Sequence, residues 1–262
     1  MVGKSLLFFT TLLKTSIKSS VSKRGAFLLE VSFIIANNLL FFALWWIFFR
    51  RFEEIASWKL PQMTALIAIS SGAFGLTQVF FGGVKQISYL ILSGDLDAFI
   101  VQPQNILLHI IGSKSFAKGW GHIATALLLT FFGGFTTIYT FPLALLCMVL
   151  GSLLFTSLAT IAYSLPFWFG PIEEIIKKYY ESILLFSFYP THIYQGFLKI
   201  IMFSIIPAGI IGTIPVELLQ NFNFLDLLLL LGSTSIFVGL AYLLFNLGLK
   251  KYESGNQFGV RN

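Results

Sequence analysis

The chain has little charge for its 262 residues: Asp, Glu, Lys and Arg make up only 11% of it, where soluble domains carry about a quarter. Apolar residues make up 56%, aromatic residues 17%, and the mean hydropathy is +0.85. A soluble domain of this size needs a polar surface that this composition does not supply. The composition therefore excludes an ordinary soluble protein and predicts an integral membrane protein.

Residues for covalent, metal or nucleotide chemistry are also scarce. Cys147 is the one cysteine, so neither an intrachain disulfide nor a cysteine-based metal site is expected. His109, His122 and His192 lack the paired spacing of zinc enzymes. The stretch 3–5 (Gly-Lys-Ser) has no upstream strand or glycine to form a phosphate-binding loop. We expect no metal, no bound cofactor and no catalytic site, and hence no ATP hydrolysis by the chain itself.

Apolar stretches of about 20 residues suit the roughly 30 Å of hydrocarbon that a membrane helix must cross. Six occur, over residues 27–49, 63–83, 122–140, 142–166, 193–212 and 225–247. The fifth is interrupted by Lys199 and Pro207, although lysine can reach the interface and proline is tolerated in membrane helices. The sequence predicts one all-α transmembrane domain over residues 1–262, with six spans.

Basic residues are distributed unevenly about these spans. Fourteen of the 17 Lys and Arg, Lys199 among them, fall on the side that holds both termini, and Arg50, Arg51 and Lys59 fall on the other. Basic loops stay in the cytoplasm, so both termini are expected there. The net charge of +6 is then explained by membrane anchoring, and nucleic-acid binding is not expected.

Two further segments have the pattern of amphipathic helices. In residues 1–24, lysines share one arc of a helix and apolar side chains lie opposite, which is typical of a helix in the membrane interface. From Gly170-Pro171 to Ile183, four isoleucines and Tyr179 share one face, and Glu–Lys pairs four residues apart share another. We expect this second helix to rest on the inner leaflet or a partner, or to extend a span into the cytoplasm.

Few polar residues lie within the spans, and each has two interpretations. Glu30 lies near the start of the first span, where a structural pairing is favoured over proton relay. Asn37 and Asn38 lie at mid-span and form either an interhelical hydrogen bond or part of a translocation path. Ser71 and Gly75 have the small-xxx-small spacing that serves packing within the monomer or dimerisation.

The loop 84–121 is long for a simple connection. Within it, Asp95 is a candidate helix cap, Asp97 suits the positive helix N-terminus, and Pro103 stops the helix. Leu96, Phe99 and Ile100 form an apolar stripe on this short helix. The segment is either a capped surface turn or a docking site for a cytoplasmic partner.

The run from Gly94 to Pro103 resembles the "Gly-acid-Leu-Asp, apolar, Pro" signature of type-2 ATP-binding-cassette (ABC) exporter permeases with six spans. The basic N-terminal helix, the Ser187–Pro190 run, and Pro207 with Pro215 before the last span agree with it. The family often has a basic residue before the proline, where this chain has Gln102.

The resemblance implies an N-terminal elbow helix, and a coupling helix formed by Gly94, Asp95, Leu96, Asp97, Phe99, Ile100 and Pro103. It implies short re-entrant helices over residues 206–226, with Pro207, Pro215 and Glu217 in them. The implied partners are a separate ABC ATPase that binds ATP and Mg, a second permease chain, identical or paralogous, and membrane lipids.

The sequence thus predicts the permease subunit of an ATP-driven exporter in the bacterial inner membrane, with an apolar or amphiphilic substrate. The alternative is an ion- or proton-coupled secondary transporter or a multi-span scaffold. Secondary transporters typically keep charged residues at mid-span, and the predicted spans have almost none.

Overall fold

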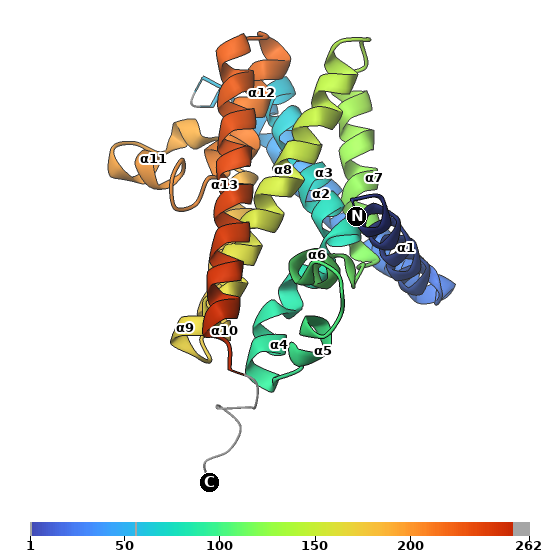
Figure 1. The fold of residues 1–262 in the computed structure, drawn as a ribbon. Coiled ribbons are helices and arrows are strands. Elements are labelled where there is room, and N and C mark those ends of the chain that lie inside the picture. The colour runs from blue at the N-terminus through green and yellow to red at the C-terminus, as the bar shows by residue number, and fades with distance from the viewer. Residues whose placement is uncertain (1, 56, 254–262) are drawn as a thin grey trace.

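The computed structural model describes residues 2–55 and 57–253. Arg261, which the topology argument counts among the basic residues, lies outside this part of the chain. The described part is helical, and its only β feature is an isolated bridge between Ile55 and Trp58. Long helices stand side by side as a bundle, and one end of the bundle carries a cluster of short helices (Figure 1). We call this end the loop end and the opposite one the far end.

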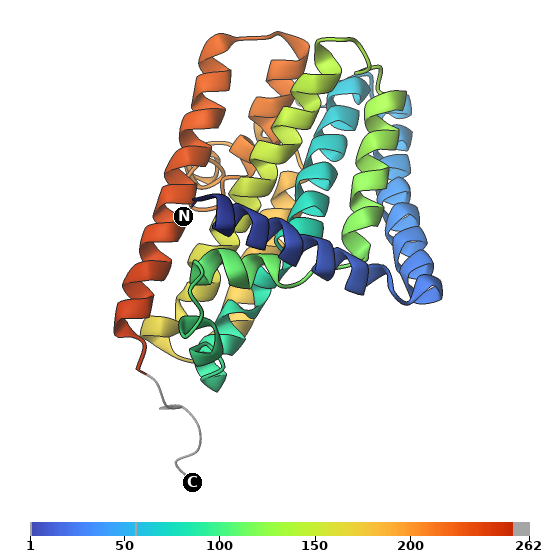
Figure 2. The ribbon, with the colours of Figure 1, turned by 45° about the vertical axis from the view of Figure 1, so that its right-hand side comes forward.

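Four helices in the described residues are long and apolar enough to cross a membrane. They are α2 (Arg24–Arg51), α3 (Leu60–Phe80), α8 (Thr140–Ser164) continued by α9 (Pro166–Phe169), and α13 (Phe224–Lys251). They coincide within a few residues with the predicted first, second, fourth and sixth spans. The start of α2 and the end of α13 lie toward the loop end (Figure 2).

The predicted third span, 122–140, differs at both ends. Helix α7 (Lys118–Phe132) begins four residues earlier and stops at Gly133, where the chain turns through Gly134 with φ +79°. Its 15 residues give a length of about 22 Å, shorter than the hydrocarbon core. The predicted span continued past the true end because the turn still contains the apolar residues Phe135, Ile138 and Tyr139 and no charge.

The predicted fifth span, 193–212, is wrong as a single helix. This stretch holds a 3₁₀ turn, η2 (Thr191–Ile193), a short helix, α11 (Phe197–Ile201), and the π-helical turn η3 (Gly209–Thr213), which leads into α12 (Ile214–Gln220). Gly196 has φ +58°, and Pro207 supplies no N–H donor. These residues break the helix that the apolar composition suggested.

The second amphipathic segment is confirmed as a helix, and one face of it packs against the bundle. Helix α10 (Glu173–Ser187) lies against α8 and α3, with Ile176, Tyr180 and Ile183 buried among their side chains. Four of its five charges lie in the first half, and the second half is apolar apart from Glu181 and two serines. Lys199, which the sequence analysis placed in the predicted fifth span, lies in the short helix α11. It is near enough to Glu217 of α12 for their charges to interact.

The core is built around α3 and α8. About nine-tenths of the apolar window of α3 is buried (89%), against 6% for α2 and 17% for α13. A Cβ on Gly75 would lie 2.8 Å from the carbonyl oxygen of Gly119, so α3 and α7 approach closely here. Ser71 is fully buried in the same stretch. The small residues therefore serve packing within this chain.

Helix α1 (Val2–Val21) crosses the bundle, roughly perpendicular to the long helices (Figure 2). Lys14 and Lys18 are exposed, and Ser16 is buried and donates its hydroxyl to the Gly112 carbonyl oxygen at 2.8 Å. Gly112 ends α6 (Ile106–Gly112), one of the short loop-end helices. The amphipathic pattern thus places α1 against the loop end.

Candidate functional site

The segment 94–103 is held at the loop end by a glycine turn. Helix α4 (Ile87–Ser93) follows the 3₁₀ turn η1 (Gly82–Gln86) and ends at Gly94, whose φ of +82° is left-handed. That conformation suits glycine. It lets the Leu96 N–H reach back to the Leu90 carbonyl oxygen at 3.1 Å, after which α5 (Asp97–Ile100) begins.

The apolar residues of this segment divide into an inner and an outer set. Leu96 is completely buried, and the Phe99 ring packs edge-on against His109 of α6, with centroids 4.8 Å apart. Ile100 keeps 42% of its surface exposed and Val101 keeps 81%. The predicted exposed stripe is therefore shifted: Leu96 and Phe99 anchor the segment, and Ile100 and Val101 face outward.

The acidic residues also differ from the expected capping pattern. Asp95 does not cap α5, because the residue at the N-cap is Leu96 and no side chain bonds the helix there. The Asp95 carboxylate instead accepts the Ser93 hydroxyl proton at 2.8 Å and remains exposed. Asp97 occupies the first turn, as expected. Pro103 is exposed just after the helix end.

A second site is the groove between α2, α7 and α10, with a volume of about 930 Å³. Asn37 and Asn38 both line it, but they differ in burial. Asn38 is buried, and its amide nitrogen lies 3.1 Å from His122 Nδ1 and 3.4 Å from Thr125 Oγ1 of α7. Asn37 is exposed toward the groove. The two interpretations therefore apply to different residues. Asn38 forms the interhelical hydrogen bond, and Asn37 remains the candidate for a translocation path.

Charged residues in this groove were missed by the sequence analysis. Lys178, Glu181 and Ser182 line it from α10, beside apolar side chains of both α2 and α10. The apolar lining residues are Leu40, Phe41, Leu44, Leu184, Leu185 and Phe188. They were missed because α10 was assigned to the membrane surface, although Lys178 and Glu181 lie three apart, the spacing of one helix face.

The groove is bounded by aromatic rings on one side and continues along α2 on the other. Phe41 packs against Phe188 and Tyr189, at centroid distances of 5.8 and 6.0 Å, and Trp45 packs against Tyr189 at 5.9 Å. Nearer the start of α2, a second cavity of about 820 Å³ is lined by Glu30 and by Lys118 of α7. Glu30 thus faces a cavity wall that also holds a lysine.

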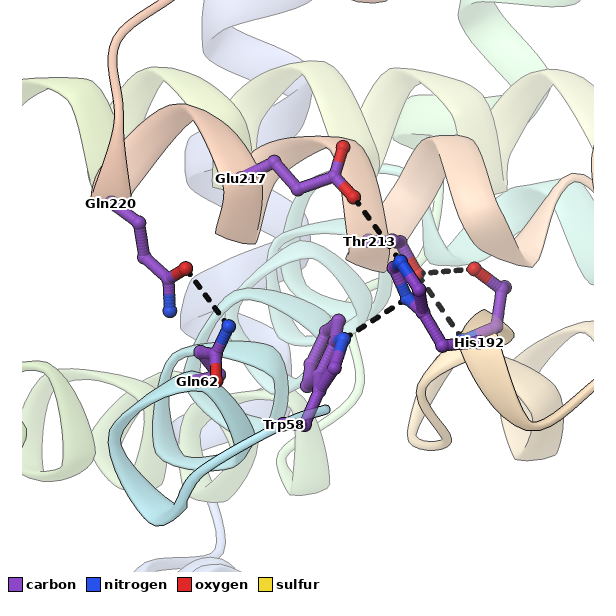
Figure 3. Close-up of polar contacts among 7 residues, drawn as sticks. Trp58, Gln62, His192, Thr213, Glu217 and Gln220 are labelled. Atoms are coloured by element: carbon purple, nitrogen blue, oxygen red, sulfur yellow. Dashed lines mark hydrogen bonds and ion pairs between the residues drawn. The ribbon is translucent and has the colours of Figure 1, made fainter. Parts of the chain in front are cut away.

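A third cluster lies among the short helices that precede α13 (Figure 3). The Trp58 indole N–H donates to His192 Nδ1 at 3.0 Å, and His192 Nε2 lies 3.8 Å from a Glu217 carboxylate oxygen. Gln62 Nε2 donates to Gln220 Oε1 at 2.9 Å. Because the indole can only donate, Nδ1 must accept, which leaves Nε2 to face Glu217.

The proline residues of the re-entrant prediction have distinct local roles. Pro215 lies in the first turn of α12, where a missing N–H leaves no bond unmade. Pro207 precedes η3, and its carbonyl oxygen accepts from Ile210 and Ile211 at 3.1 Å each. The Thr191 and Thr213 hydroxyls bond each other at 2.8 Å. Spacing could not reveal this cluster, because Trp58 and Gln62 lie 134 and 158 residues from their partners His192 and Gln220.

The family of the chain follows from comparison with known proteins. The family model described as "ABC-2 family transporter protein" matches residues 34–256. The chain therefore belongs to the ABC-2 transporter family and is a multi-pass membrane protein. The match contains the segment 94–103, the groove residues Asn37 and Asn38, and the cluster around Glu217. A search of curated proteins gave no match.

Proposed function

We propose that the chain is the permease subunit of an ATP-driven exporter that moves an apolar or amphiphilic substrate out of the cytoplasm or inner leaflet. A separate ABC ATPase binds ATP and Mg and supplies the energy. Membership of the ABC-2 family supports a transport subunit over a catalytic enzyme.

The exposed pair Ile100 and Val101 carries the coupling part of this proposal. Both stand on a short helix whose Leu96 is fully buried and whose Phe99 is packed on His109, so the pair is rigidly presented. Exposed apolar residues on an anchored helix are typical of a surface that enters a partner's groove. We call residues Gly94–Pro103 the coupling segment and assign it to ATPase docking.

The groove between α2 and α10 is the proposed substrate path. Leucines and phenylalanines line most of it, while Asn37, Lys178 and Glu181 supply polar groups. This combination suits an amphiphile, because the apolar wall contacts its chain and the polar groups contact its head. The rings of Phe41, Trp45 and Tyr189 close the groove on one side and would have to separate for passage.

A second permease chain, identical or paralogous, would cover the groove. Only 6% of the α2 apolar window is buried in this chain, so α2 has most of its surface available for a partner helix or for lipid. With the loop end in the cytoplasm of a bacterial inner membrane, α2 would begin and α13 would end on that side. Docking of the ATPase at the coupling segment would then move the α2 and α10 walls of the path.

The test is co-purification of the ATPase with a tagged chain in mild detergent. We expect a P-loop ATPase to accompany the wild-type protein and to be lost from Ile100→Asp, since this substitution buries a carboxylate in the interface. Ile138→Asp is the matched control, because Ile138 is 81% exposed in the turn after α7. Absence of any ATPase from the wild-type preparation would refute the exporter assignment; retention by Ile100→Asp would refute the docking surface.

A further inference from the structure

The end of the last long helix reaches the coupling segment through Tyr252. This residue follows α13 with extended backbone angles (φ −70°, ψ 124°), while its N–H still bonds the Gly248 carbonyl oxygen at 3.0 Å. Its hydroxyl donates to the Gly94 carbonyl oxygen at 3.2 Å, across 158 residues of sequence. Gly94 is the glycine whose left-handed turn starts the coupling segment.

The ring of Tyr252 is fixed independently of its hydroxyl. It packs edge-on against Phe167 of α9 at a centroid distance of 6.2 Å, and Phe167 packs against Phe245 of α13 at 5.9 Å. Removing the hydroxyl alone therefore leaves the aromatic packing in place. The position thus allows the hydrogen bond to be tested apart from the fold.

The electrostatic surroundings keep this hydroxyl a donor. Burial, the Asp97 carboxylate as a second acceptor that competes for the same proton, and the charges of Asp97 and Asp95 together raise the pKa of Tyr252 to about 12. The phenol therefore stays protonated at physiological pH. Both aspartates belong to the coupling segment, so the Tyr252 hydroxyl lies between the turn at Gly94 and the carboxylates of Asp95 and Asp97.

The other flank of the segment is attached to different helices. His109 of α6 lies between Phe99 of the coupling segment and Phe8 of α1, at centroid distances of 4.8 and 5.1 Å. The segment is thus held by α1 and α6 on one side and by the end of α13 on the other. A displacement of the segment has to move these attachments or break them.

From this geometry we infer that Tyr252 is a positioning residue, whose hydroxyl keeps the coupling segment in register with the end of α13. Through the hydrogen bond between Tyr252 and Gly94, a movement of the coupling segment caused by a docked ATPase is transmitted to α13, and a movement of α13 is transmitted to the coupling segment. The inference rests on the proposed function for its consequence in transport. The attachment itself is testable on the permease alone.

The experiment compares Tyr252→Phe with Tyr242→Phe in the full-length protein in detergent. Tyr242 lies on the same helix and is 52% exposed, so it controls for loss of a phenol hydroxyl. Hydrogen–deuterium exchange of the amides of residues 96–101 should become about 2- to 10-fold faster in Tyr252→Phe, the range expected for one hydrogen bond. Tyr242→Phe should exchange like the wild type. Unchanged exchange in Tyr252→Phe, or an equal increase throughout α3, would overturn the inference.

A second measurement uses the complex with the ATPase. Tyr252→Phe should retain the co-purified ATPase at the wild-type ratio, while the rate of ATP hydrolysis per complex changes by at least about 2-fold. A wild-type rate with faster exchange at 96–101 would overturn the transmission role. If no ATPase accompanies the wild type, the proposed function fails, and the exchange measurement alone decides whether Tyr252 positions the segment.

Discussion

Asn38 is the one buried residue of α2, all of which is described, and its hydrogen bonds attach α2 to α7. Asn38→Leu removes the donor to His122 Nδ1 and Thr125 Oγ1. Interhelical hydrogen bonds in membranes contribute about 0.6 kcal/mol on average and up to about 1.7 kcal/mol. We expect Asn38→Leu to lower the stability by about 1 kcal/mol, or about 2–4 °C in melting temperature.

Asn37→Leu is the matched control, because the neighbouring asparagine is exposed in the groove and bonds no other helix among the contacts described above. Thermal unfolding in detergent, followed by tryptophan fluorescence, should show a loss for Asn38→Leu and none for Asn37→Leu. The stability losses of Asn38→Leu and His122→Leu should also be less than additive in the double variant, because both substitutions break the same bond between Asn38 and His122. Equal losses at the two asparagines, or full additivity, would refute the separation of their roles.

Two further substitutions test the loop end. In Gly83→Ala the new Cβ would overlap the Ile110 carbonyl oxygen, so the melting temperature and ATPase co-purification should both fall, whereas Gly232→Ala, which meets open space, should preserve both. Lys85→Met should raise stability at pH 7 by about 1–3 kcal/mol, because burial, followed by repulsion from Lys118, lowers the pKa of Lys85 from 10.5 to about 8. Between pH 8 and 10.5 the unfolded chain binds more protons at Lys85 than the folded chain, so the stability of the wild type rises with pH. The stability difference between Lys85→Met and the wild type should therefore shrink in that window. Melting curves that show the same difference at every pH would contradict this.

Hydropathy predicted the four longest helices well because each holds a stretch of at least 18 mainly apolar residues within one unbroken helix. The amphipathic pattern also located α10, but it did not show that the buried face of this helix packs on α8 and α3. Hydropathy failed after Pro190, because apolar composition does not report the left-handed Gly196 or the π-helical turn. Mean hydropathy depends only on which residues a segment contains, whereas its secondary structure depends on which backbone hydrogen bonds it can form.

For the candidate docking site, the sequence predicted the short helix in segment 94–103 but not the direction of its side chains. Leu96 and Ile100 lie four residues apart and were assigned to one exposed stripe, yet Leu96 is completely buried. The turn at Gly94 places it against the core before α5 begins. Tyr252 could not be found at all, because its partners lie in another loop and no local pattern links them.

The broken path between α10 and α13 has a consequence for how the protein is synthesised. The carbonyl oxygen of Ser187 accepts from the Ser70 hydroxyl of α3 at 2.6 Å, and the backbone N–H of Thr191 donates to the Thr213 hydroxyl at 3.4 Å. Unpaired backbone groups in hydrocarbon cost several kcal/mol each. A nascent chain that has reached Thr191 has not yet made Thr213. The Thr191 N–H can gain this partner only after η3 has been synthesised, so we expect residues 187–191 to reach their final packing together with η3 and α12.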